Sequence, residues 1–376
     1  MKHIKELDAL RALAVAFVLI SHAELPIRPL INKIPNGHIG VNLFFVLSGF
    51  LITSILLYQR QRAESEGTTK GVAVRNFYIR RVLRIFPAYY LTIALILVAS
   101  KFIATGFKRP ELLYSLTYTM NFYISAIQKW PRVTLHFWSL AVEEQFYLFW
   151  PFVVLFIRRS FLLPIFLGFI CIGITFQLFY MHNIEYGYLL TYTCFDALGM
   201  GALLAWIMIY QPDKLPLLLK ISSWLAVPCV AVVLAAAFMD GLIYPIRTFV
   251  SIPALWLVAF VMLHEGKAQH SFLMRICNNR VLQFLGRISY GLYLYHVPVF
   301  VLLTQWLTPR LIRSFGQSTL LSYAVAVACI FATVLLSWIS WMVIEKPILR
   351  FKRFFTYSQK KQGSRAQAAV SKVPAI

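Results

Sequence analysis

Apolar runs long enough to cross a lipid bilayer follow one another along almost the whole chain. About ten segments reach the length that a transmembrane helix needs, and they are residues 9–26, 40–58, 85–104, 136–157, 161–181, 187–209, 222–239, 244–263, 285–306 and 318–343. Because a membrane-spanning segment must satisfy its own backbone hydrogen bonds, such runs form helices. The sequence therefore predicts an all-α fold, a polytopic integral membrane bundle of about ten transmembrane helices.

Composition and charge agree with a membrane protein. Hydrophobic residues make up 60% of the 376 residues and charged residues 13%, whereas charged residues make up about 25% of a soluble domain. The net charge of +22 is compatible with a protein that binds nucleic acid, but the distribution of the basic residues along the chain argues against this. With the N-terminus inside, about 26 of the 36 Lys and Arg residues fall in cytoplasmic segments. We expect cytoplasmic termini, surrounding lipid and no nucleic-acid partner.

The domain organisation follows from the same runs. Residues 1–345 are predicted to form one transmembrane domain, and residues 346–376 a basic cytoplasmic tail that is disordered and lies against anionic lipid. Asp8 and Arg11 interrupt the first run, so we expect it to remain as a span and not to be cleaved as a signal peptide. The mixed stretch 110–130 is interpreted as an interfacial loop or half-helix, and Glu345-Lys346-Pro347 as a helix stop.

Arg11 and His22 are predicted to share one face of the first helix. Eleven residues bring a helix back to within about 20° of its starting direction and raise it by about 16 Å. Asp8 lies one turn before Arg11 and can pair with its guanidinium. Ionisable groups inside a membrane are costly and usually functional. The alternative is an Arg that extends to the interface and an interfacial His near the other end.

Three guanidiniums precede the third span, in Arg80-Arg81-Val82-Leu83-Arg84-Ile85-Phe86-Pro87. Arg binds phosphate with two parallel hydrogen bonds, so this cluster is a candidate phosphate site. A topology anchor is the alternative, because cytoplasmic loops are normally basic. Arg84 and Arg11 both enter a span, which an anchor does not require.

The longest polar stripe lies in the fourth span. His136, Ser139, Glu143 and Tyr147 repeat at i, i+3, i+7 and i+11 and therefore share a helical face. A carboxylate at that depth needs a partner or a raised pKa, and the candidate partners are Arg11, His22 and His296. Trp138, Ser139 and Tyr147 are candidate oxyanion donors. The alternative is a hydrogen-bonded polar core without catalytic function.

Further polar and small residues are expected to face inward. Asp196 is flanked by glycines in the sixth span, and Ser289, Tyr293 and His296 share a face of the ninth. The segment from Gly40 to Ser48-Gly49 is predicted to let helices pack closely, or to admit a slender substrate. The five cysteines are scattered and show no metal spacing. We therefore expect no metal ion, and no phosphate loop or nucleophile-elbow motif is present.

Together these motifs resemble the acyltransferase 3 family, the membrane O-acyltransferases of bacterial surface polysaccharides. The matching residues run in order along nearly the whole chain. They are Leu7-Asp8 with Arg11-x10-His22, Gly40-x3-Phe44-Phe45-x2-Ser48-Gly49, Arg80-Arg81-x2-Arg84-Ile85-x-Pro87, His136-x-Trp138-Ser139-Leu140-x2-Glu143-x2-Phe146-Tyr147, Asp196-Ala197-Leu198, Ile288-Ser289-Tyr290-Gly291-x-Tyr293-x2-His296 and Glu345-Lys346-Pro347.

The resemblance implies a multi-pass protein of the bacterial cytoplasmic membrane. It would transfer an acyl group, most often acetyl, from cytoplasmic acyl-CoA to a carbohydrate hydroxyl of the cell envelope or of a secreted compound. Acyl-CoA would be a substrate, with no permanently bound cofactor. The family pattern makes Arg11 and His22 essential, and it assigns Arg80, Arg81 and Arg84 to the donor.

The catalytic candidates are thus His22, Arg11, Glu143 and His136. His22 would deprotonate the hydroxyl or carry the acyl group, and Glu143 or His136 would orient it. The candidates for substrate binding or support are Asp8, Trp138, Ser139, Tyr147, Asp196, Ser289 and His296. One departure concerns Asp196: many relatives have an Arg shortly before it, whereas this chain reads Tyr192-Thr193-Cys194-Phe195. A different acceptor or a different packing partner would each account for it.

Two other function classes fit parts of the pattern. A transporter or flippase of a glycan or acylated compound also needs ionisable groups inside a bundle, but the chain lacks the repeat symmetry of many transporters. A structural membrane subunit would explain the apolar runs but leaves the polar stripes without a role. Release of free CoA in detergent distinguishes an acyltransferase from both.

Overall fold

The computed structural model describes residues 2–23, 33–67, 69–183, 186–238, 246–266, 271–355 and 374–375. Within these residues the chain is helical, apart from two strands of two residues each, β1 (Lys2–His3) and β2 (Pro374–Ala375), which pair in parallel. The ends of three expected spans, at residues 24–26, 239 and 244–245, lie outside the described residues. So do residues 356–373 and 376 of the expected tail.

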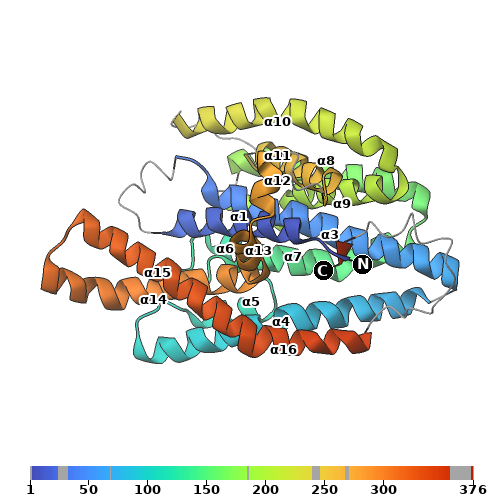
Figure 1. Cartoon of the computed structure of the whole chain (residues 1–376). Coiled ribbons are helices and arrows are strands. Elements are labelled where there is room, and N and C mark those ends of the chain that lie inside the picture. Colours follow the sequence, from blue (N-terminus) through green and yellow to red (C-terminus); the bar gives the residue numbers. More distant parts are fainter. Residues whose placement is uncertain are drawn as a thin grey trace.

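Each expected span contains a long helix (Figure 1). These helices are α1 (Lys5–His22), α3 (Asn36–Glu66), α4 (Lys70–Phe102), α7 (Phe137–Phe156), α8 (Arg159–Asn183), α9 (Phe195–Tyr210), α10 (Leu215–Phe238), α11 (Ile246–Leu263), α14 (Ser289–Phe315) and α15 (Thr319–Ser340). The shorter helices are α5 (Arg109–Leu116), α6 (Met120–Ile127), α12 (Phe272–Cys277), α13 (Arg280–Arg287) and α16 (Lys346–Leu349). Short turns complete the described chain: η1 (Gly187–Leu189), η2 (Thr191–Cys194), η3 (Pro212–Lys214), η4 (Trp341–Glu345) and η5 (Arg350–Phe355).

Among the described residues, seven helices are long and apolar enough to cross a membrane. They include α3, α4, α7, α8 and α15 and the helices that contain α9 and α10, whereas α11 is an apolar helix of shorter length. The all-helical architecture is thus confirmed. The count of about ten spans and the side of each terminus stay predictions. The stretch 110–130, interpreted as an interfacial loop or half-helix, holds two short helices, α5 and α6. Its place at the membrane interface stays a prediction.

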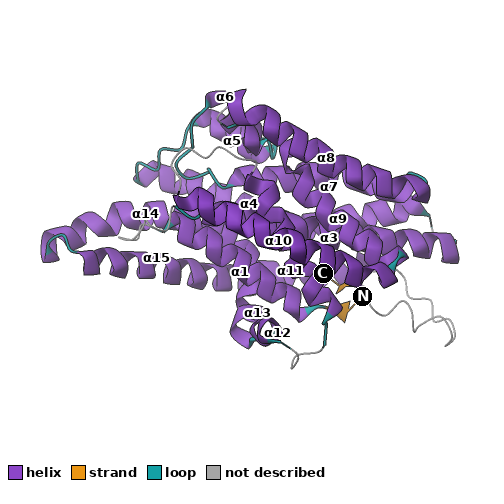
Figure 2. Cartoon of the chain, turned by 90° about the horizontal axis from the view of Figure 1, so that it is seen from above, coloured by secondary structure: helices purple, strands orange, loops and turns teal. Residues whose placement is uncertain are grey.

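Helix α3 runs through the middle of the bundle, and α1, α7, α9 and α11 pack around it (Figure 2). In its most apolar stretch 83% of the residues are buried, compared with 22% for α8. Glycines permit this packing, because a Cβ at Gly40 would overlap the carbonyl oxygen of Ala14 in α1 and one at Gly49 would overlap that of Leu198 in α9. The expected close approach of helices at this segment is confirmed.

Helix α13 fixes the position of the first turns of α1. The two helices pack against each other, and a Cβ at Gly286 would overlap the backbone carbonyl of Asp8. Only a residue without a side chain permits so short a distance between two backbones. Because Asp8 and Arg11 lie on these turns, the contact also sets where both side chains point.

The chain does not stop being helical at Glu345-Lys346-Pro347, so the expectation of a helix stop is wrong. Helix α15 passes through the π-type turn η4 into α16 and η5, which lie along α4 (Figure 1). Pro347 falls in the first turn of α16, where a missing backbone N–H breaks no helical hydrogen bond. The division of the chain at residue 345 stays a prediction, although residues 346–355 are helical.

Candidate functional site

A pocket of about 100 Å³ lies between α1, α3, α4, α7 and α14. Seven candidates from the sequence line it: Arg11, Arg81, Arg84, Ser139, Glu143, Tyr147 and Ser289. The remaining lining residues include Phe44, Ser48, Glu144, Tyr290 and Tyr293. The structure thus brings together the basic motif, part of the polar stripe and Arg11. It does not bring Arg80, Asp8, Trp138, Asp196 or the three candidate histidines into the lining.

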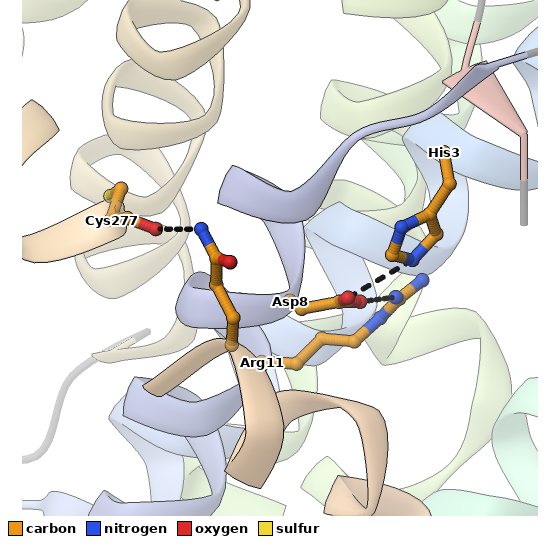
Figure 3. A network of polar contacts seen from close by, with 5 residues as sticks. His3, Asp8, Arg11 and Cys277 are labelled. Atoms are coloured by element: carbon orange, nitrogen blue, oxygen red, sulfur yellow. Dashed lines mark hydrogen bonds and ion pairs between the residues drawn. The ribbon is translucent and has the colours of Figure 1, made fainter. Parts of the chain in front are cut away.

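Asp8 orients the guanidinium of Arg11, as the sequence predicts. Nη1 of Arg11 donates to Oδ1 of Asp8 at 2.8 Å, and Nε2 of His3 lies 3.0 Å from Oδ2 of the same carboxylate (Figure 3). Asp8 is buried and the Arg11 side chain is largely so. The carboxylate therefore holds Arg11 against the pocket wall, at the end of the bundle where α1 begins.

The guanidiniums of α4 complete this end of the pocket. Arg81 lies over the rings of Phe77 and Tyr147, with its Cζ 5.7 and 5.5 Å from their centroids. Arg84 lies within electrostatic range of Arg11, Arg81 and Asp8. Because so many like charges repel one another, this end of the pocket favours an anionic ligand.

Carboxylates of α7 also line the pocket. Oε1 of Glu143 accepts a hydrogen bond from the Ser48 hydroxyl at 3.0 Å, and Oε2 accepts one from the Tyr147 hydroxyl at 2.8 Å. Glu144 lines the same pocket. These two hydrogen bonds connect Glu143 to α3 and to its own helix. The expectation that Glu143 orients His22 stays a prediction. Glu143 and Arg81 interact electrostatically across the pocket.

Three histidines meet beyond the pocket, towards the other end of α1. The ring centroid of His296, in α14, lies 4.9 Å from that of His22 and 5.0 Å from that of His136, which precedes α7. Arg11 and His22 both face α14, since Arg11 lines the pocket with Ser289 of that helix. This is the common face that the spacing predicts. Among the described residues, no group of three or more His, Cys, Asp or Glu is placed to hold a metal ion.

Backbone carbonyls select the tautomer of each ring. Nδ1 of His22 lies 2.9 Å from the carbonyl oxygen of Val18, Nε2 of His136 lies 3.0 Å from that of Leu294, and Nδ1 of His296 lies 2.6 Å from that of Tyr293. A carbonyl oxygen only accepts, so each of these nitrogens carries the hydrogen. The basic lone pair is then on Nε2 of His22, Nδ1 of His136 and Nε2 of His296.

Tyr293 and Ser139 connect the pocket to the histidines. Both line the pocket, and their hydroxyls form a hydrogen bond to each other. The Tyr293 hydroxyl also lies 3.3 Å from the backbone carbonyl of His136, and its ring centroid lies 5.5 Å from that of His296. A group that passed along the pocket would therefore meet the histidine cluster next.

Asp196 and Trp138 belong to a different polar cluster, centred on Arg247 of α11. The Arg247 Cζ lies 5.2 Å from the Trp138 ring centroid, its Nε lies 3.5 Å from Oδ1 of Asn42, and its Nη1 donates to the Tyr188 carbonyl. Asp196 is fully buried, accepts a hydrogen bond from Thr248 at 2.7 Å and interacts electrostatically with Arg247. A guanidinium from another helix thus faces Asp196, which the sequence around Cys194 does not reveal.

Sequence reasoning missed several residues of these clusters. Glu144 follows Glu143 directly and is a half-buried residue of the pocket lining. Its place in an apolar run was the one signal for it. Ser48 belongs to the segment predicted either to pack closely or to admit a substrate, and its hydroxyl lines the pocket and donates to Glu143. Arg247 is the single charged residue in the eighth apolar run, and a charge in such a run is a sign of a functional or paired group.

Comparisons with known proteins agree with the resemblance found in the sequence. The family model described as an acyltransferase domain matches residues 4–342. A peptidoglycan O-acetyltransferase of Listeria monocytogenes is 30% identical over 95% of this chain and 57% of the relative. A Bacillus subtilis protein provisionally given the same activity is 32% identical over 96% of this chain and 57% of the relative. No solved structure matches the chain significantly.

The chain therefore spans 57% of the length of the curated relatives it matches. The family match, by contrast, extends over nearly all of the chain and includes every candidate residue of the pocket and of the histidine cluster. The apolar helices and the family match together indicate that the chain is a multi-pass membrane protein. We conclude that the chain belongs to the acyltransferase 3 family of enzymes.

Proposed function

We propose that this protein transfers an acetyl group from cytoplasmic acetyl-CoA to a hydroxyl of a cell-wall glycan, across the bacterial cytoplasmic membrane. Peptidoglycan is the first acceptor to test, because the Listeria relative carries that activity in its name. One observation carries the proposal: a pocket with three guanidiniums at one end leads, through Tyr293, to a cluster of three histidines.

The donor would enter from the end where α1 begins. Arg11, Arg81 and Arg84 would bind its phosphates, for which guanidinium geometry is suited. The pantetheine arm is narrow and flexible, so it can follow the apolar lining that Phe44 and Leu51 provide. The thioester would then reach the ring of Tyr293 and the histidines behind it.

His22 would act as the general base. Its Nδ1–H is held by the Val18 carbonyl, so Nε2 can take the proton of the acceptor hydroxyl. The hydroxyl oxygen attacks the thioester carbon, the new C–O bond forms and the C–S bond breaks. The imidazolium returns the proton to the CoA thiolate. Ser139 and Tyr293 lie where the pocket ends and are candidate donors to the developing oxyanion.

The test is transfer of labelled acetyl from acetyl-CoA in inverted membrane vesicles, with the glycan fraction collected. Wild type should label the glycan and release CoA, and His22→Ala should do neither while it is still inserted. His264→Ala is the matched control, because His264 lies at the end of α11 and packs on Phe260. Equal labelling by wild type and His22→Ala would refute the proposal.

The products separate the remaining alternatives. CoA release without labelled glycan would keep an acyltransferase and change the acceptor. Label that stays on the protein in a hydrolysis-sensitive form would favour an acyl-histidine over a base. The absence of CoA release with every acyl-CoA, in detergent as well as in vesicles, would favour a transporter or flippase.

A further inference from the structure

Lys352 lies in η5, beyond the part of the chain that the family model matches. Both α16 and η5 pack on α4, which carries the basic motif (Figure 1). The continuous helical path from α15 through η4 therefore returns the chain to α4, the helix whose guanidiniums line the basic end of the pocket. A segment outside the family domain thus contacts the helix that carries Arg81 and Arg84.

The environment of Lys352 is unusual for a lysine near a helix end. Its side chain is half-buried, whereas Arg350 and Arg353 on the same turns are exposed. Lysines normally extend their ammonium groups into water or towards lipid headgroups. Lys352 is instead partly covered by the neighbouring chain.

The largest electrostatic effects on Lys352 come from positive charges. They belong to Arg84, Arg81, Arg80 and Arg11. Among the residues that the structure describes, no carboxylate forms an ion pair with it. Repulsion and burial both oppose a charged ammonium at this position, so a ligand with several negative charges would stabilise it.

We propose that Lys352 is a donor-binding residue that contacts the 3′-phosphate of CoA. The assignment rests on the proposed function for the direction in which the donor enters. CoA carries its pyrophosphate next to the pantetheine arm and its 3′-phosphate farther out, on the ribose. Arg11, Arg81 and Arg84 line the pocket, whereas Lys352 does not. The inner guanidiniums therefore match the pyrophosphate, and the outer ammonium matches the terminal phosphate.

The experiment compares two nucleotides that differ by this phosphate alone. Binding of adenosine 3′,5′-bisphosphate and of 5′-AMP to the full-length protein in detergent is measured by calorimetry, for wild type, Lys352→Gln, Lys352→Arg and Arg353→Gln. Arg353→Gln is the matched control, since it removes the same charge from an exposed site one residue away. The unfolding temperature of each variant verifies that it is folded.

Wild type should bind the bisphosphate more tightly than 5′-AMP. Lys352→Gln should weaken binding of the bisphosphate about tenfold and leave binding of 5′-AMP unchanged, and Lys352→Arg should retain most of the preference. Equal weakening for both nucleotides, an equal effect of Arg353→Gln, or no preference in wild type would each overturn the assignment. Kinetics with acetyl-CoA and its 3′-dephospho form give the second readout, because Lys352→Gln should raise KM about tenfold only for the former.

The two proposals fail in different ways. If no glycan is labelled but the bisphosphate preference depends on Lys352, the acceptor or the reaction is wrong and the phosphate site stands. If glycan is labelled with equal KM for both donors, in wild type and variant alike, the reaction stands and Lys352 has no part in it.

Discussion

The imidazole ring of His296 packs edge-on against that of His22, with 4.9 Å between the ring centroids. Both rings give their N–H to a backbone carbonyl, and Nε2 of His296 has no hydrogen-bond partner and is shielded from solvent. A proton that His22 takes up would therefore be next to a second basic lone pair. His296 would act through His22, as a positioning residue that stabilises the imidazolium.

Replacement of His296 by Gln should lower kcat and leave KM for acetyl-CoA nearly unchanged. The physical reason is that His296 contacts the proposed base but does not line the donor pocket. The loss should be about 10- to 100-fold, which is at or below the lower limit of the range for a direct acid or base, because His296 acts through His22. Steady-state kinetics in detergent measures both constants. A rise in KM of the same size as the fall in kcat would instead indicate a distorted pocket.

Gly286→Ala should destabilise the protein and weaken binding of the donor together. The added Cβ would overlap the backbone of Asp8, so α13 and the first turns of α1 must separate. We expect a loss of about 1–3 kcal/mol, the usual range for overpacking, and a raised KM for acetyl-CoA because Arg11 moves with Asp8.

Gly168→Ala is the control for that substitution. Gly168 lies inside α8, and nothing is within 4 Å of the position that its Cβ would occupy. Alanine there should be neutral or stabilising by up to about 1 kcal/mol. Thermal unfolding in the same detergent compares the two variants, and equal unfolding temperatures would contradict the close approach of α13 to α1.

Glu143→Gln separates the charge of this residue from its hydrogen bonds. The amide can keep contacts with Ser48 and Tyr147, which now bond to the carboxylate. The negative charge that faces Arg81 is lost. We expect kcat to fall and KM for acetyl-CoA to stay the same or decrease, because one repulsive charge near the donor phosphates is removed. A raised KM with unchanged kcat would show that the carboxylate only supports the pocket wall.

Glu111 should give part of the pH dependence of stability. It lies in α5, outside the membrane-spanning helices, and Oε2 accepts a hydrogen bond from Thr134 at 2.8 Å. Burial raises the pKa of this carboxyl above its ordinary value of 4.5, although the Thr134 hydroxyl opposes the shift. The folded state therefore holds the proton more tightly than the unfolded state does.

It follows that stability decreases as the pH rises from the unfolded pKa through the folded one. Glu111→Gln removes this titration. Its unfolding temperature should fall less than that of wild type between about pH 5 and pH 7. Parallel pH profiles for the two proteins would contradict a raised pKa.

The helices and the faces within them could be predicted from the sequence. Each predicted run contains a helix, and the pairing of Asp8 with Arg11 follows from their spacing. These features depend on local periodicity, which one sequence contains. Contacts between helices depend on which faces pack together. The meeting of His296 with His22, and that of Arg247 with Trp138, join residues far apart in the chain and could not be deduced.

The path of the chain past Pro347 could not be predicted for a different reason. A Pro after an apolar run is a common sign of a helix end. Here the turn η4 shifts the hydrogen-bond pattern before Pro347, so the ring falls in a first turn, where it is tolerated. Such a turn leaves no clear signal in the sequence. The position of Lys352 depends on the path of the chain after this turn, so it could not be predicted either.

The burial of α3 by its neighbouring helices limits which substitutions this protein can accept during evolution. A helix with neighbours on all sides has no face on which substitutions are neutral, and an inserted residue would turn everything beyond it by about 100°. Such an insertion before Ser48 would break the hydrogen bond from Ser48 to Glu143 and, in the same step, the close packing of Gly49 on Leu198. Variation between related proteins should therefore collect in helices such as α8, in which 22% of the most apolar stretch is buried, and α3 should change most slowly.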